Sequence, residues 1–318
     1  MIKEDLPTEL VYTNEFVGRF LDPSLYICQF EAKDDFGKVV ADLDIKLLES
    51  RGLQKLKETP DDMLARINCL PTAAMVAINI LLGKRTFGFG NEALTQADFY
   101  LTGVLSHLND SGDIVNGDFK KGLPSFHYES GEAYHQYIIS LARRFGLDGL
   151  VLTNFSDASF VTDLIKLGGI VLISLDNFFI RDVVVPELGL NNLSPGKHIE
   201  ILHGMSADKV IYSDVANRRG DSIWDGKNRT ADFDQINKYL TCPRKNDFST
   251  RAIILFPSEL KLEKLRERFS QNGNILIPSE HPILSKRQEL SLKDWNIEMQ
   301  RLFEEKGLAQ WDLAEYLK

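Results

Sequence analysis

Residues 69–82 read CLPTAAMVAINILL, the most apolar helix-length stretch of the 318-residue chain. Pro71 suits the first turn of a helix, where its missing N–H would have had no partner, and Gly83 suits the position just past the end. Because the stretch is apolar on nearly all sides, it predicts a buried central helix rather than an amphipathic surface helix.

A hairpin is predicted further along, within HIEILHGMSADKVIYSD (residues 198–214), because two alternating stretches flank a polar turn. With Met205–Ala207 as the turn, the ladder sets His198 directly opposite Asp214. Directly opposed residues have Cβ atoms about 4.5–5.5 Å apart, close enough for a carboxylate to orient an imidazole. A slip of one residue in the register would break this pairing.

The remaining patterns place helices early in the chain and strands late. Helical patterns cover 36–56, 91–108, 131–145 and 157–167, and β patterns cover 25–28, 170–174, 199–202, 210–212 and 252–256. This order predicts an α+β fold, in which N-terminal helices and the central helix pack on an antiparallel sheet.

The chain changes character after Pro257, from which point charged helical sequence dominates. We therefore divide it into a main domain, residues 1–257, with a lead-in segment at 1–24, and a helical C-terminal extension, residues 258–318. Apolar residues recur at helical spacing in the extension, so each helix has a stripe that must be buried. We expect the extension to pack on the main domain or to bind a protein partner.

Composition and charge exclude several functional classes. The formal net charge is −9, and an acidic chain without clustered Lys and Arg is not expected to bind nucleic acid. No run of 18 apolar residues is present, and residues 1–10 contain no apolar signal core, so no membrane association is expected. A cytoplasmic location follows.

The cysteines point the same way. Cys28, Cys69 and Cys242 are too few for a disulfide scaffold and form no CxxC pair for zinc, so we expect no metal and no other cofactor. A reducing compartment would keep them as free thiols.

Cys69 is the candidate nucleophile, since it opens the predicted central helix. The unpaired N–H groups and the positive dipole end at a helix start stabilise a thiolate, which is the reactive form of cysteine. A buried structural cysteine is the alternative. In the predicted hairpin His198 supplies a base and Asp214 a carboxylate to orient it. His203 competes for the role of base, but alternation along the strand turns it to the opposite face, which favours a structural or surface role.

Two segments resemble a known family. NCLPTAAM (Asn68–Met75) resembles the nucleophile motif of the C39-like peptidases, a papain-like cysteine peptidase family with Cys-Gly-Pro-Thr/Ala followed by small residues and Met. GKHIEILHGMSADKVIYSDVAN (residues 196–217) resembles that family's histidine motif, in which Gly-Gly-His opens a strand and Asp or Asn closes the next. His198 also lies 129 residues after Cys69, near the spacing of about 130–150 residues in papain-like enzymes.

The resemblance spans residues 25–256 and implies a papain-like fold with Cys69 as nucleophile, His198 as base and Asp214 as orienting residue. Two positions depart from the family pattern. Leu70 stands where the family has Gly, which would narrow the space beside the nucleophile. The family's oxyanion Gln, usually within about ten residues before the Cys, is absent there. Gln29, in LYICQFE (residues 25–31), and Gln54 are the candidates, and the resemblance favours Gln29 over Gln54. A surface amide is an equally weighted alternative for Gln29.

The implied activity is that of a cysteine hydrolase that cleaves a peptide or small amide through an acyl-enzyme. An acyl- or amide-transferring enzyme with the same triad remains open, as does an inactive papain-like binding protein without a working oxyanion hole.

The Gln29 assignment can be tested by replacing this residue with Ala. Loss of one oxyanion donor should lower kcat by on the order of 100-fold or more. An activity within a few-fold of the wild type would move the role to Gln54 or to no side chain.

Overall fold

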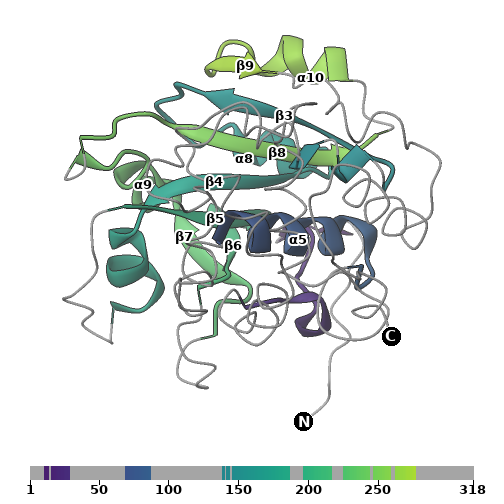
Figure 1. The fold of residues 1–318 in the computed structure, drawn as a ribbon, viewed down its shortest axis with the longest axis horizontal. Helices are drawn as coiled ribbons and strands as arrows, with labels where there is room; N and C mark the ends of the chain where they lie inside the picture. The colour runs from purple at the N-terminus through teal and green to yellow at the C-terminus, as the bar shows by residue number, and fades with distance from the viewer. Residues whose placement is uncertain are drawn as a thin grey trace, which may run out of the picture.

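The computed structural model describes residues 11–13, 16–28, 69–86, 138–139, 141–143, 145–186, 196–216, 225–243, 246–258 and 262–276. In this part of the chain the fold is α+β, with helices packed on one antiparallel sheet, as predicted (Figure 1). The predicted helices at 36–56 and 91–108 lie outside the described residues. In the described ranges, no helix is both long enough and apolar enough to cross a membrane.

The described sheet contains nine strands in the order β1-β2-β5-β4-β8-β3-β9, and β6 pairs with both β5 and β7. In chain order the strands are β1 (Val11–Tyr12), β2 (Phe16–Gly18), β3 (Leu147–Thr153), β4 (Ile170–Asp176), β5 (Lys197–Ser206), β6 (Lys209–Asp214), β7 (Arg229–Asp232), β8 (Arg251–Pro257) and β9 (Asn274–Leu276). The helices are α5 (Cys69–Leu82), α8 (Val161–Lys166), α9 (Phe233–Lys238) and α10 (Leu262–Phe269), with a 3-10 turn η1 (Pro23–Leu25) and a π-helical turn η5 (Ile180–Val184).

Helix α5 has the bounds predicted for the central helix, and every residue from Leu70 to Leu81 is buried. It packs against β4, β5 and β8 and lies in front of β5 in the view of Figure 1. The buried Asn79 ties the helix to its surroundings: its amide donates to the carbonyl oxygen of Leu25 at 3.3 Å and accepts from the backbone N–H of Thr86 at 2.8 Å. Burial of residues 70–81 and the two hydrogen bonds of Asn79 together hold in place the helix that begins at Cys69.

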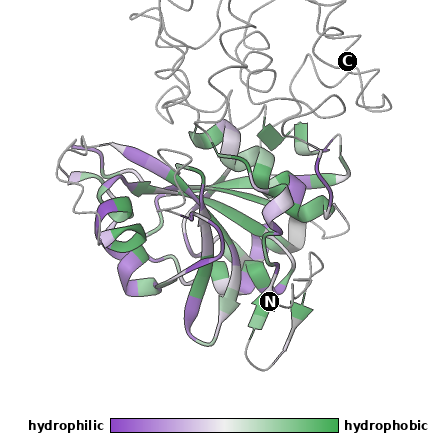
Figure 2. Ribbon diagram, turned by 90° about the horizontal axis from the view of Figure 1, so that it is seen from below, coloured by the Kyte–Doolittle hydropathy of each residue, from purple (hydrophilic) through white to green (hydrophobic). Residues whose placement is uncertain are grey.

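Both faces of the middle of the sheet are covered, because all seven residues of β4 are buried. One buried cluster joins side chains of α8 and α9 to Val171, Ile173 and Leu175 of β4. Figure 2 shows hydrophobic residues concentrated in the strands of the sheet. Helix α8 ends where predicted, at a Gly pair, and Gly168 adopts a φ of +83° that favours glycine.

Strand β5 is the strand around which the sheet is organised. Along one edge its first half pairs with β4 and its second half with β2, and along the other edge it pairs with β6. Its pairing with β6 slips by one residue at His203, which has no partner on β6. Beyond this β-bulge Glu200 pairs with Asp214, so Asp214 lies on the same face as Glu200 and His198.

The predicted register, with His198 directly opposite Asp214, is therefore wrong by two positions. The turn consists of Ala207 and Asp208 and lies later than the predicted one, since Ser206 pairs with Lys209. A shifted turn alone would have moved the two site residues to opposite faces, and the bulge restores them to one face.

Two expectations for the N-terminal part also need correction. The segment 25–28 is not a strand: Pro23–Leu25 form η1, and residues 26–28 belong to no strand. The side chain of Asp22 accepts from the N–H of Ser24 at 2.7 Å, and this local cap outweighs the β-like composition. The lead-in at 1–24 contains β2, so it contributes to the sheet.

The described part of residues 258–318 is built into the same core. Strand β9 pairs with β3 at the edge of the sheet, and Leu265 and Phe269 of α10 lie in the buried cluster with α8 and α9. The expected boundary at residue 257 thus divides one packed unit, because the apolar stripe of α10 is buried against the sheet. Residues 277–318 lie outside the described residues, so a partner role there stays a prediction.

We expect Phe269→Ala to lower the free energy of unfolding by about 3–5 kcal/mol, because it removes a ring that is 1% exposed. Phe248, which is 65% exposed, gives a matched control, and Phe248→Ala should change stability by no more than about 0.5 kcal/mol. Urea denaturation measures both. Equal effects would mean that α10 is not part of the cooperative core.

Candidate active site

Cys69 is the first residue of α5 and is half-buried, whereas Cys28 and Cys242 are buried. A helix of this length presents unpaired N–H groups and a positive dipole end at its first turn, where both can stabilise a negative charge that develops during a reaction. Leu70 is 2% exposed, so it packs in the core. The expectation that it narrows the space beside the nucleophile stays a prediction.

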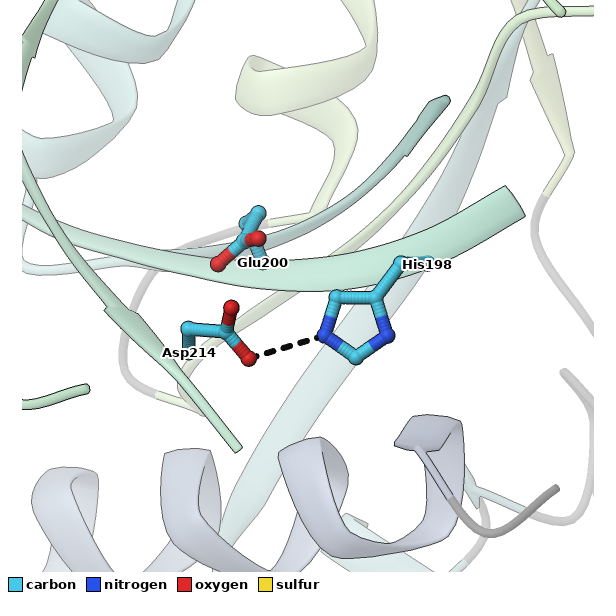
Figure 3. A group of neighbouring side chains, drawn as sticks. All are labelled: His198, Glu200 and Asp214. Carbon is cyan, nitrogen blue, oxygen red and sulfur yellow. Dashed lines mark hydrogen bonds and ion pairs between the residues drawn. The ribbon is translucent and has the colours of Figure 1, made fainter. Parts of the chain in front are cut away.

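His198 and Asp214 are joined by a hydrogen bond from Nε2 to Oδ1 at 2.9 Å (Figure 3). His198 stands near the start of β5, and Asp214 closes β6. Both side chains are buried. The structure therefore brings together the predicted base and its orienting residue, although they are diagonal neighbours across the ladder rather than direct partners.

Asp214 is held through its backbone and its side chain. Its N–H donates to the carbonyl oxygen of Gly226 at 2.8 Å, and its own carbonyl oxygen accepts from the hydroxyl of Tyr26 at 2.8 Å. Oδ1 also accepts from the N–H of Ala216 at 2.6 Å. A Cβ at Gly226 would lie 2.1 Å from the Asp214 carbonyl oxygen, so only glycine fits at this close approach.

The pKa of His198 is raised well above its ordinary value of 6.5. Burial, the largest single effect, lowers it. The charge and hydrogen bond of Asp214, together with a hydrogen bond to Cys69 and the charge of that residue, raise it and prevail. These effects favour an imidazolium on His198 at neutral pH, hydrogen-bonded to the carboxylate of Asp214 and near Cys69.

His203 has the structural role predicted for it. Its Nδ1–H donates to the carbonyl oxygen of Arg19 at 2.6 Å, and its Nε2 accepts from the hydroxyl of Ser213 at 2.9 Å. Burial, the largest effect, lowers the pKa of His203 to about 4, so the ring is neutral. It joins the bulge of β5 to the N-terminal segment and to β6.

Glu200 is the site residue that sequence reasoning missed. It is fully buried, and its carboxyl oxygens lie with His198 nitrogen and Asp214 oxygen atoms in a group whose members are all within 4.8 Å of one another. Among the described residues this group has the spacing to hold a metal ion. The sequence did contain a signal for Glu200: it is a charged residue within an otherwise apolar strand, two positions after the candidate base, and such residues are seldom buried without a specific role.

The predicted oxyanion donors cannot be placed, because Gln29 and Gln54 lie outside the described residues. The backbone N–H of Cys69 remains as a donor, since the first residues of a helix have no intrahelical partner for this group.

Comparison with known proteins identifies no relative: no protein-family model matches the chain, and no curated protein matches it significantly.

We expect Asp214→Asn to lower the pKa of His198, because loss of the negative charge leaves burial as the dominant effect. In the wild type the raised pKa keeps the ring protonated as the pH rises through neutrality. In the variant the ring should be neutral there. The ¹⁵N chemical shifts of the imidazole nitrogens, followed against pH, measure this difference.

His203 provides an internal control for this titration. With a pKa of about 4 it should stay neutral across the same pH range in both proteins. A His198 that is already neutral at neutral pH in the wild type would contradict the ion-pair assignment.

Proposed function

We propose that the chain is a cysteine hydrolase that cleaves a peptide or small amide bond, with Cys69 as nucleophile, His198 as general base and acid, and Asp214 as orienting residue. The observation that carries the proposal is that the imidazole of His198 is hydrogen-bonded to the carboxylate of Asp214 and lies near enough to Cys69 for that residue to raise its pKa. A nucleophile in reach of a base that a third group orients is the arrangement needed for acyl transfer.

The surrounding fold supports a papain-like architecture. A central helix carries the thiol at its start and packs on an antiparallel sheet, and neighbouring strands of that sheet carry the imidazole and the carboxylate. Since several folds host the same triad, the proposal rests on the site and takes the fold as supporting context.

The reaction begins with the thiolate of Cys69 attacking the carbonyl carbon of the substrate. The resulting oxyanion would lie beside the N–H of Cys69, at the positive end of α5, and a second donor would come from Gln29 or Gln54. Asp214 engages Nε2 of His198, so Nδ1 is the nitrogen that protonates the leaving amine. The C–N bond breaks, a thioester remains on Cys69, and His198 then removes a proton from the water that hydrolyses it.

An amine could replace water in the last step, which would make the chain an acyl- or amide-transferring enzyme with the same residues. The first half of the reaction is identical in both cases. Adding an amine acceptor to the assay and measuring the acyl-amine product by mass spectrometry separates the two.

Brief iodoacetamide treatment should alkylate Cys69 before Cys28 or Cys242, because Cys69 alone among the three is half-buried and paired with His198. Mass spectrometry of tryptic peptides measures the order. His198→Ala should slow the alkylation of Cys69 and leave the other two cysteines unchanged, so they act as controls in the same sample.

A peptide library then tests the activity, with cleavage expected in the wild type and absent in Cys69→Ala. Preferential alkylation of Cys28 or Cys242, or cleavage that persists in Cys69→Ala, would overturn the proposed function. Alkylation of Cys69 without any turnover would favour an inactive binding protein.

A further inference from the structure

Glu200 lies in the middle of the site without a role in the reaction described above. It is the direct partner of Asp214 across the β5–β6 ladder and stands two residues after His198 on the same face of β5 (Figure 3). Its side chain is 0% exposed. A carboxyl group in such a position must be satisfied by its neighbours, because water is excluded.

The carboxyl groups of Glu200 and Asp214 lack a hydrogen-bond donor between them, and one added proton would supply it. Asp214 uses Oδ1 for both His198 and Ala216, whereas its Oδ2 and both oxygens of Glu200 have no hydrogen-bond partner among the described residues. Two ionised carboxylates have acceptors only and cannot bond to each other. A protonated carboxyl carries one O–H donor, which is what Oδ2 of Asp214 lacks.

The charges show which of the two carboxyls takes the proton. Burial, the largest effect, raises the pKa of Glu200 well above its ordinary value of 4.5, and the negative charge of Asp214 raises it further. Asp214 faces the His198 imidazolium and accepts two hydrogen bonds at Oδ1, so its neighbours already use it as an acceptor. The proton therefore belongs to Glu200.

We propose that Glu200 is a positioning residue that stays protonated and donates its O–H to Oδ2 of Asp214, which turns Oδ1 toward His198. This inference rests on the proposed function for its consequence, though not for the protonation itself. Glu200 acts on Asp214 and, through it, on His198, so it touches neither the substrate nor the reacting sulfur.

A divalent cation bound by His198, Glu200 and Asp214 is the competing use of the same atoms. A bound cation would require an ionised Glu200. It would also require Nε2 of His198 to lose its proton, because this nitrogen would give its lone pair to the metal and could no longer donate to Asp214. The two arrangements also differ in charge. With a protonated Glu200 the imidazolium of His198 balances the carboxylate of Asp214, whereas a bound cation would face two carboxylates and a neutral imidazole. The two uses exclude each other, so one set of variants separates them.

Infrared spectroscopy tests the protonation directly. The difference spectrum of wild type minus Glu200→Gln at neutral pH should show the carbonyl band of a protonated carboxylic acid, which shifts in D₂O. Absence of that band would overturn the proposal. This measurement does not depend on activity. If the band is present but Cys69 is unreactive, the proposed function is wrong and the protonation of Glu200 is still supported.

The positioning role is tested by comparing Glu200→Gln with Glu200→Leu. Gln is neutral and still offers an N–H to Oδ2, so the alkylation rate of Cys69 should stay within about threefold of the wild type. Leu offers no donor, and the rate should fall by about 10- to 100-fold, the loss expected for a hydrogen bond to a charged group. Equal rates in Glu200→Leu and wild type, or equal losses in both variants, would overturn the positioning role.

A folding control and a metal arm complete the experiment. If Glu200→Leu fails to fold by circular dichroism, Glu200→Met, which has a similar length and also offers no donor, replaces it in the comparison of alkylation rates. Titration of the wild type with ZnCl₂ or MnCl₂ by calorimetry should show no binding that Glu200→Gln removes. Stoichiometric binding lost in that variant would assign the cluster to a metal and overturn the proposal.

Discussion

The hydrogen bond between His198 and Asp214 depends on a carboxylate that distant parts of the chain hold in place. Tyr26 reaches the Asp214 carbonyl oxygen from the N-terminal segment, and Gly226 binds its N–H from the loop before β7. The side chain is fixed as well, through the N–H of Ala216. A carboxylate positioned in this way needs little reorganisation while the imidazole gives up its proton and regains it during the reaction, which is where enzymes gain most from polar groups.

The buried His198–Asp214 pair keeps its charges balanced only if the adjoining Glu200 is neutral. His198 as an imidazolium and Asp214 as a carboxylate form an ion pair. An ionised Glu200 would add an uncompensated charge to a region from which water is excluded, at a cost of several kcal/mol. A chain that keeps such a residue gives up stability at the site, which is typical of positions where function competes with packing.

Sequence periodicity predicted the elements with strong local signals and missed the strands that depend on pairing with other strands. Helix α5 matches its predicted bounds because its apolar run and its Pro71 and Gly83 signals agree. Strand β3 was missed, since Asp148 and Gly149 disfavour strand structure and only pairing with β8 and β9 makes it a strand. The three-residue strands β2 and β9 are too short for any periodic signal.

The candidate site shows the same division. Cys69, His198 and Asp214 were found from residue type and spacing, whereas their register was not, because neither the bulge at His203 nor the exact turn is encoded in an apolar pattern. The role of Glu200 could not be derived either. It depends on which oxygens of Asp214 are already occupied, and that is a property of the folded chain.

The bulge at His203 also determines which changes in the hairpin the site would tolerate. His198 and Asp214 are 16 residues apart, an even number, and with a two-residue turn an even separation puts two residues on one face only if one strand carries an extra residue. A homologous hairpin without the bulge would need an odd separation or a turn that is one residue longer. A single-residue deletion that leaves the bulge in place would therefore turn the two side chains to opposite faces, whereas deletion of His203, which removes the bulge, would keep them on one face.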